Sequence, residues 1–222
     1  MLFPLGDDNS SLRSKPYITY GLIGANVVIF LSELFGAFDP IRNYGIVPAN
    51  FFLHTLPYQN FLWTLFLHGG WSHLVFNMLF LYVFGDNVED NFGKMKFIVF
   101  YFVAGFCGTL AHIYFNQTSQ APLIGASGAI SGILGAYIFL FPNNQIKVFV
   151  VGFLFTVRAW IALGLWIALQ FFLGVSEYAQ DGGGTGEGVA HIAHIGGFLS
   201  GVLLVILFRR KTVGITKTVE TQ

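Results

Sequence analysis

The sequence predicts an all-α, polytopic membrane protein in which six transmembrane helices form one bundle and the first loop associates with the membrane. Of the 222 residues, 55% are hydrophobic and only 10% are charged, too few polar side chains to cover a soluble protein. Six apolar runs follow one another, and the basic residues gather beside every second connection. No linker rich in proline or serine divides the chain, so residues 1–222 are expected to form a single membrane domain with a six-helix core at about 17–208.

The apolar runs have about the length of a membrane-spanning helix, roughly 17–25 residues. They lie near residues 17–35, 71–85, 96–115, 125–141, 155–173 and 190–208. The second and fourth runs, at about 15–17 residues and 1.5 Å per residue, are shorter than a hydrocarbon core of roughly 30 Å, so their helices are expected to end below the membrane surface. Residues 1–9 lack the basic stretch and cleavage site of a secretory signal, so the first run is expected to be an uncleaved anchor.

Two of the connections have unusual compositions. The connection at 39–70 is rich in aromatic residues and contains Pro48 and Pro57, which favours a segment lying partly in the membrane interface over a seventh span. The connection at 174–188 contains three consecutive glycines and several acidic residues. That composition is typical of a flexible segment, either a cover over the start of the last helix or a solvated connector.

The charge distribution predicts the orientation. Six crossings place both chain ends and the turns at 86–95 and 142–154 on one side of the membrane. Of the eleven basic residues, Arg42 alone lies on the other side. The remaining ten lie on or near the side of the chain ends: Arg13, Lys15, Lys94, Lys96, Lys147, Arg158, Arg209, Arg210, Lys211 and Lys217. By the positive-inside rule, both termini are expected to be cytoplasmic.

In this orientation the second, fourth and sixth helices begin at the outer face, and each brings polar side chains there. Ser127 opens the fourth helix and His194 the sixth, while His73 and Asn77 lie one turn apart on one face of the second. A neutral imidazole can take the proton of a serine hydroxyl and so activate it as a nucleophile. The acidic residues lie in loops, tails and helix ends, and none can be assigned behind His194, so a Ser-His dyad is predicted in place of a triad.

Acyl transfer also requires donors for the developing oxyanion. The side chains of His73 and Asn77 and the backbone N–H of Ser127, at a helix start where amides are unpaired, are the candidates. Gly125 and Gly128 leave room for the backbone of a substrate.

The same residues have structural interpretations. Gly128 and Gly132, and Gly197 and Gly201, have the spacing that serves close helix packing. A lone serine in a span usually bonds to its own helix, and a lone histidine is as readily structural. The interpretations are compatible, because close packing of the fourth and sixth helices would itself bring the serine toward His194.

Other kinds of site have weaker support. His191 and His194 are spaced to share a metal, but no acidic or cysteine partner accompanies them in the sequence, and no H-E-x-x-H motif is present. No aspartate lies within a predicted span, which argues against an aspartyl protease. The sequence implies no metal, no cofactor and no nucleic-acid partner, and it leaves the oligomeric state open.

Together the motifs resemble those of the rhomboid intramembrane serine proteases. The resemblance covers about residues 17–208. It rests on Gly125-Ala126-Ser127-Gly128, on His73 and Asn77 in their five-residue pattern, on Ala193-His194-Ile195-Gly196-Gly197 followed by Gly201, and on residues 84–90, which are similar to the end of the second helix in bacterial members.

The resemblance implies that Ser127 is the nucleophile, that His194 is the general base, and that His73, Asn77 and the Ser127 amide form the oxyanion hole. His68, five residues before His73, matches a further family histidine and is taken to support the first loop. The implied substrates are transmembrane segments of other proteins, cut near the outer face within the lipid bilayer, and the implied location is a bacterial inner membrane. No cofactor is implied.

The chain departs from the family pattern at two positions. Trp63 is followed by Thr64, where some members have arginine, and Ser131 stands where some members have a tyrosine that stacks on the catalytic histidine. The predicted function is an intramembrane serine endopeptidase. The alternative is a non-catalytic rhomboid-like factor that binds membrane proteins, or a small transporter with a polar pathway. The presence of both Ser127 and His194 favours the enzyme.

Overall fold

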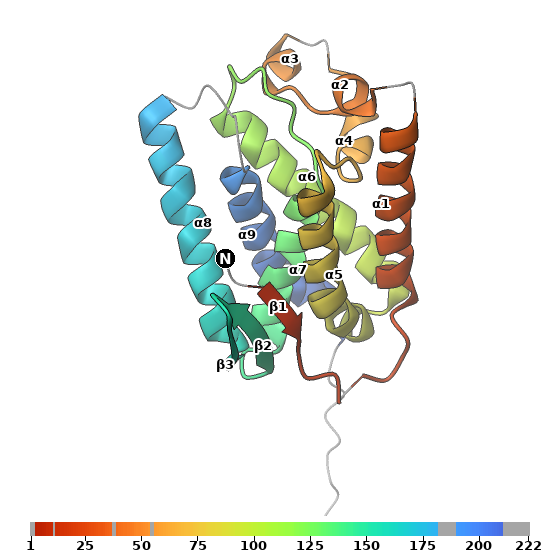
Figure 1. Ribbon diagram of the computed structural model, residues 1–222, viewed down its shortest axis with the longest axis vertical. Coiled ribbons are helices and arrows are strands. Elements are labelled where there is room, and N and C mark those ends of the chain that lie inside the picture. Colours follow the sequence, from red (N-terminus) through yellow and green to blue (C-terminus); the bar gives the residue numbers. More distant parts are fainter. Residues whose placement is uncertain (1–2, 11, 37–38, 54–55, 182–189, 211–222) are drawn as a thin grey trace, which may run out of the picture.

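The computed structural model describes residues 3–10, 12–36, 39–53, 56–181 and 190–210, and a bundle of long helices dominates it (Figure 1). The long helices are α1 (Tyr17–Phe35), α5 (Trp71–Phe92), α6 (Lys94–Phe115), α7 (Ser127–Leu140), α8 (Ala159–Asp181) and α9 (His191–Phe208). Within the described residues, four of them, α1, α6, α8 and α9, are long and apolar enough to cross a membrane by length and composition. These helices confirm that the chain is a membrane protein.

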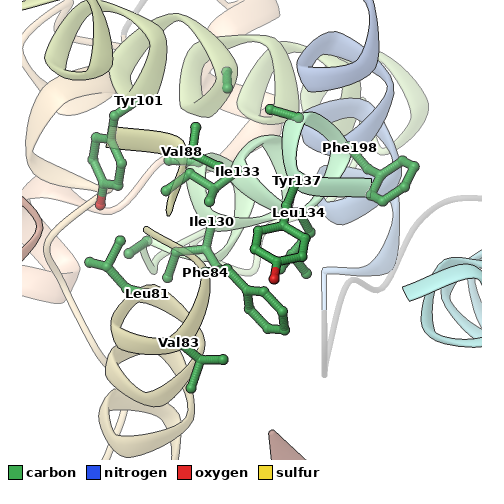
Figure 2. Packing of buried hydrophobic residues seen from close by; sticks show 14 of the residues in the cluster. Leu81, Val83, Phe84, Val88, Tyr101, Ile130, Ile133, Leu134, Tyr137 and Phe198 are labelled. Carbon is green, nitrogen blue, oxygen red and sulfur yellow. The ribbon is translucent and has the colours of Figure 1, made fainter. Parts of the chain in front are cut away.

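Helix α7 lies in the middle of the bundle. Every residue from Gly128 to Tyr137 is buried, and Figure 2 shows Ile133 and Leu134 of α7 packed with Phe84 of α5 and Phe198 of α9. A helix that is apolar all round is stable only when it is surrounded. With 14 residues, it is about 21 Å long, less than a hydrocarbon core, which confirms that this helix is short.

Helix α5 continues beyond the predicted end at residue 85, so the prediction of a short second helix and of a turn at 86–95 was wrong. The helix has 22 residues and ends at Phe92. The next residue, Gly93, has a φ of +81°, in the left-handed region that favours glycine. Glu89 is buried in its last turns and accepts hydrogen bonds from the backbone N–H and hydroxyl of Thr19, both at 2.8 Å. A polar run can therefore stay helical because the start of α1 supplies its partners.

A three-stranded antiparallel sheet corrects the all-α prediction. It consists of β1 (Phe3–Gly6), β2 (Gln145–Val150) and β3 (Phe153–Arg158), in the order β1-β2-β3. The region predicted as a turn at 142–154, together with the first residues of the predicted fifth span, forms the hairpin. In β2, buried Ile146 and Val148 alternate with exposed neighbours, the period of two that marks a half-buried strand.

Three short helices form the connection at 39–70, at the end of the molecule opposite the sheet (Figure 1). They are α2 (Pro40–Tyr44), α3 (Pro48–Phe52) and α4 (Asn60–Trp63). Proline stands at the first position of α2 and α3, where its missing N–H costs no hydrogen bond. None of the three is long enough to span a membrane.

Helix α8 is also longer than its predicted span of 155–173, since it runs on to Asp181. The first part of the connection predicted at 174–188 is therefore helical. Residues 182–189, with the three glycines, lie outside the described residues.

Candidate active site

Glycines let α7 and α9 touch through their backbones. A β-carbon on Gly197 would overlap the carbonyl oxygen of Gly128, and a β-carbon on Gly201 would overlap that of Gly132. The two G-x-x-x-G pairs therefore face each other across one helix interface, as close packing requires. Ser127 begins one of these helices, and His194 lies in the first turn of the other.

Helix α6 packs against α7 and α9 at the same place. A β-carbon on Gly108 would lie 2.7 Å from the carbonyl oxygen of Ala193 and 3.3 Å from the Cα of Gly128. A β-carbon on Gly128 would itself lie 3.8 Å from the Ala193 oxygen. Because Ser127 precedes Gly128 and His194 follows Ala193, the backbones that carry the serine and the histidine are neighbours.

The N–H of Ser127 lies at the start of α7. The preceding residue, Ala126, makes no side-chain cap, and the first amide of this turn with a backbone partner in the described residues is that of Ile130, which donates to the Ala126 carbonyl at 3.0 Å. Ser131 donates its hydroxyl to the Ser127 carbonyl at 2.6 Å. Among the described residues no hydrogen bond joins the Ser127 hydroxyl to His194, and in hydrolases such bonds often tighten only when substrate binds.

Two side-chain nitrogens converge beside Gly125. A β-carbon built there would lie 2.7 Å from Nε2 of His73 and 3.6 Å from Nδ2 of Asn77, and the φ of +116° also favours glycine. The Gly69 N–H donates to Nδ1 of His73 at 3.4 Å, so the ring proton is on Nε2. Nδ2 of Asn77 is buried and has no hydrogen-bond partner in the described part of the chain. Two N–H donors thus point to a position two residues before Ser127.

His194 is buried, and α8 supplies two of its contacts. Nδ1 of His194 lies 2.8 Å from Oε1 of Gln170. The Trp166 ring lies 5.9 Å from the imidazole, at an interplanar angle of 32°. An aromatic ring therefore packs against His194 from α8, whereas Ser131 contributes only its hydroxyl to α7. Sequence reasoning missed Gln170 and Trp166, because residues 166 and 170 read as part of an apolar run whose inner face was unknown.

His68 lies behind His73. It is buried, its ring centroid is 5.0 Å from that of His73, and its Nδ1 is 3.1 Å from the Phe66 carbonyl oxygen. Burial, with a smaller contribution from His73, lowers the pKa of His68 to about 4. The ring is neutral at physiological pH and packs against His73 without adding a charge.

Thr64 ties the first loop to the segment that leads to Ser127. Its hydroxyl donates to the carbonyl of Leu123, and its own carbonyl accepts the N–H of Gly125 at 2.8 Å. Leu123 is also paired with Ile46 by two backbone hydrogen bonds, of 2.7 and 3.1 Å. The residue that departs from the family pattern at position 64 is thus a buried anchor, a role that sequence reasoning did not assign.

His191 lies near a carboxylate that the sequence analysis did not assign to it. Oε2 of Glu177, on α8, lies 3.4 Å from Nδ1 of His191. The carboxylate is on His191, and the Nδ1 atom of His194 faces Gln170 instead.

Comparison with known proteins places these residues in a family. Residues 57–211 match the Rhomboid domain. The chain is 30% identical over 199 residues to the mitochondrial Rhomboid protein 1 of Saccharomyces cerevisiae, covering 84% of this chain and 51% of the relative. It is 32% identical over 192 residues to the Rhomboid protease GluP of Bacillus subtilis, covering 85% of this chain and 34% of the relative.

A plant relative is similar over the same region. RHOMBOID-like protein 1 of Arabidopsis thaliana is 26% identical over 224 residues, which cover 87% of this chain and 53% of the relative. The chain spans about half the length, or less, of these curated relatives. Because the Rhomboid domain matches most of the chain, including all the helices from α5 to α9, the chain belongs to the rhomboid family.

Proposed function

We propose that the chain is an intramembrane serine protease in which Ser127 is the nucleophile and His194 the general base. The observation that carries this proposal is the meeting of α7 and α9 through Gly128 and Gly197, beside the donors of His73 and Asn77. Further support is the family itself, in which the relative GluP is named a protease.

The residues have the chemistry for acyl transfer. His194 accepts the hydroxyl proton of Ser127 at Nε2 while the serine oxygen bonds to the carbonyl carbon of the substrate. The resulting oxyanion receives hydrogen bonds from the Ser127 amide, from His73 Nε2–H and from Asn77 Nδ2–H. The imidazolium then gives its proton to the leaving amine. Water attacks the acyl-enzyme by the same route in reverse, which frees the acid and restores the serine.

An uncommitted donor supports the oxyanion role of Asn77. A buried N–H without an acceptor costs free energy in the resting protein, roughly 1–3 kcal/mol. Such a group is rare in native proteins, and a ligand that brings an acceptor recovers the cost. A carbonyl oxygen that becomes an oxyanion is an acceptor of that kind.

The proposed orientation places both chain ends in the cytoplasm and the candidate site near the outer face. Within the described residues, the segments before α1 and after α9 contact the same end of α5, since Ser14 donates to Asp90 at 3.0 Å and Arg210 donates to Asn91 at 3.3 Å. Two segments on one side require an even number of crossings. Helices α5 and α7, together with the four helices that are long and apolar enough to cross a membrane, make six. The basic residues concentrate at these ends, which favours the cytoplasmic assignment. We propose a bacterial inner membrane as the location.

The proposed substrates are transmembrane segments of other proteins, cut near the outer face, with α2 to α4 lying in the interface beside the site. The test is to incubate the full chain, reconstituted in liposomes, with a panel of single-span proteins and to map the cut bonds by mass spectrometry. We expect cuts within or at the outer end of the spans, and none with the Ser127→Ala variant. Cuts of equal yield with both proteins would contradict the proposal and favour a binding or transport role.

A further inference from the structure

We propose that Gln170 is the positioning residue for His194: its side-chain carbonyl accepts the Nδ1–H of the imidazole and so leaves Nε2 unprotonated for Ser127. This inference rests on the proposed function. In it, an amide from α8 occupies the place behind the base where a triad has a carboxylate.

The contact is short and enclosed. Oε1 of Gln170 lies 2.8 Å from Nδ1 of His194, and both side chains are 8% exposed. The neighbours of Gln170 in sequence, Leu169 and Phe171, are more than half exposed, so they face outward while Gln170 faces α9. A buried amide in an apolar helix is costly unless it is bonded, and His194 is the partner that offsets this cost.

The identity of the atoms decides the tautomer. A carbonyl oxygen has no proton, so the hydrogen on this bond belongs to Nδ1 of His194. A neutral imidazole with its proton on Nδ1 has its lone pair on Nε2, the state that a general base needs. The opposite orientation of the amide would donate to Nδ1 and leave the proton on Nε2, where it would block the reaction.

Among the residues that the structure describes, the other groups around His194 do not offer this interaction. The titratable groups near enough to affect it are the histidines His73, His112 and His191, one from each of α5, α6 and α9. His73 accepts a hydrogen bond from the Gly69 backbone, and Nδ1 of His191 faces Oε2 of Glu177 at 3.4 Å. Gln170 is the partner that the structure gives to Nδ1 of His194.

Trp166 completes the arrangement from one turn earlier on α8. Residues 166 and 170 are four apart and share a helix face, and the Trp166 ring packs against the His194 ring at 5.9 Å. The aromatic ring restrains the tilt of the imidazole. The hydrogen bond to the amide fixes the direction in which Nδ1 points.

The test compares Gln170→Met, which keeps the size but removes the acceptor, with Gln170→Glu, which keeps an acceptor. Leu169→Met, on the exposed face of the same helix, is the matched control. We expect Gln170→Met to lower kcat on the order of 10²-fold with little change in KM, at the lower end of what a positioned base contributes. Gln170→Glu is expected to retain activity and to move the acid limb of the pH profile upward, because a carboxylate favours the imidazolium. Leu169→Met is expected to match the wild type.

A second measurement is independent of activity. Nitrogen-15 NMR of histidine-labelled wild-type protein is expected to show His194 with a protonated Nδ1 and a bare Nε2, and Gln170→Met is expected to give a mixture of tautomers. A proton on Nε2 in the wild type would overturn the proposal even if the variant fails to fold. So would a Gln170→Met protein with unchanged kcat and pH profile. If Ser127→Ala and His194→Ala abolish turnover while Gln170→Met does not lower it, only the role of Gln170 fails; if Ser127→Ala leaves turnover intact, the proposed function fails.

Discussion

Gly197 of α9 lies with its backbone against the carbonyl oxygen of Gly128 in α7, so closely that no β-carbon fits between them. The contact is one residue from Ser127 and three from His194. The distance between the proposed nucleophile and base is therefore set by two glycines, and the packing of the bundle and the geometry of the site depend on the same atoms.

Gly197→Ala is expected to lower both stability and activity. The added methyl group overlaps the Gly128 oxygen, and overpacking of this kind typically costs about 1–3 kcal/mol. The measurements are the thermal unfolding temperature in detergent and kcat. The matched control is Gly24→Ala on α1, where a β-carbon meets nothing within 4 Å and the substitution is expected to be neutral or slightly stabilising. A Gly197→Ala protein as stable and active as the wild type would show that the helices are not in contact here.

Asn77→Ala is expected to reduce kcat by roughly 10²-fold or more while leaving the unfolding temperature nearly unchanged. The side chain is buried with an unpartnered donor, so its removal takes away no hydrogen bond of that donor. Asn26→Ala is the contrast: that buried amide donates to the Leu22 carbonyl at 2.7 Å, so its loss is expected to affect stability and not kcat. An unchanged kcat for Asn77→Ala would contradict the oxyanion role of Asn77 and favour a packing role.

Thr64→Val is expected to lower activity through the backbone that leads to Ser127. Valine has nearly the same shape but cannot donate to the Leu123 carbonyl, and the loss of one buried hydrogen bond costs about 1 kcal/mol. Thr64→Ser keeps the hydroxyl and is expected to behave as the wild type. Activity assays and thermal unfolding of both variants test this anchor. If Thr64→Val and Thr64→Ser have the same activity and the same unfolding temperature, the Thr64 hydroxyl is not an anchor.

The carboxyl of Asp7, near the C-terminal end of α7, is expected to make the stability of the protein depend on pH. Asp7 accepts hydrogen bonds from the Tyr137 hydroxyl at 2.5 Å and from the Asn87 amide at 2.8 Å. Burial, partly opposed by the Tyr137 bond and reinforced by Asp86, raises the pKa of Asp7 from its ordinary value of 3.8 to about 7. The folded protein thus holds a proton that the unfolded chain releases. The stability this gives is complete below about pH 4 and is lost as the pH rises through 7.

Unfolding temperatures measured between pH 5 and pH 8 check this directly. The quantity that tests Asp7 is the difference in unfolding temperature between the wild type and Asp7→Asn, because the buried His68, whose pKa is lowered, adds stability over the same interval in both proteins. Relative to Asp7→Asn, whose amide carries no charge at either pH, the wild type is expected to lose stability from pH 5 to pH 8. Asp8→Asn leaves the Asp7 carboxyl in place and removes only an exposed neighbour that contributes a little to its raised pKa, so this variant is expected to stay close to the wild type. Equal pH dependence of the wild type and Asp7→Asn would contradict a protonated Asp7.

Side-chain composition predicted most of the helices because an apolar run long enough to span a membrane has few alternatives to a helix. It also placed Ser127 and His194 at helix starts. It failed where a polar residue finds its partner far away in the chain. Glu89 remains in α5 because Thr19, 70 positions earlier, donates to it.

Gln170 shows the same limit at the candidate site. One amide in an apolar run does not reveal which face of the helix is turned inward, so its contact with His194 required the packing of α8 on α9. The hairpin of β2 and β3 was missed for a different reason. In the sequence its strands directly precede an apolar span. The alternation of buried and exposed residues in 145–150 is too short to be distinguished from that span.

The nucleophile is the central claim, and covalent labelling tests it most directly. The full chain is incubated in detergent with a fluorophosphonate probe, digested, and analysed by mass spectrometry, alongside Ser127→Ala, His194→Ala and the neighbouring variant Ser131→Ala. If Ser127 is activated by His194, the probe is found on the peptide that contains Ser127 in the wild type and in Ser131→Ala, and it is absent from the other two. Equal labelling of the wild type and Ser127→Ala would contradict a serine protease with its nucleophile at Ser127.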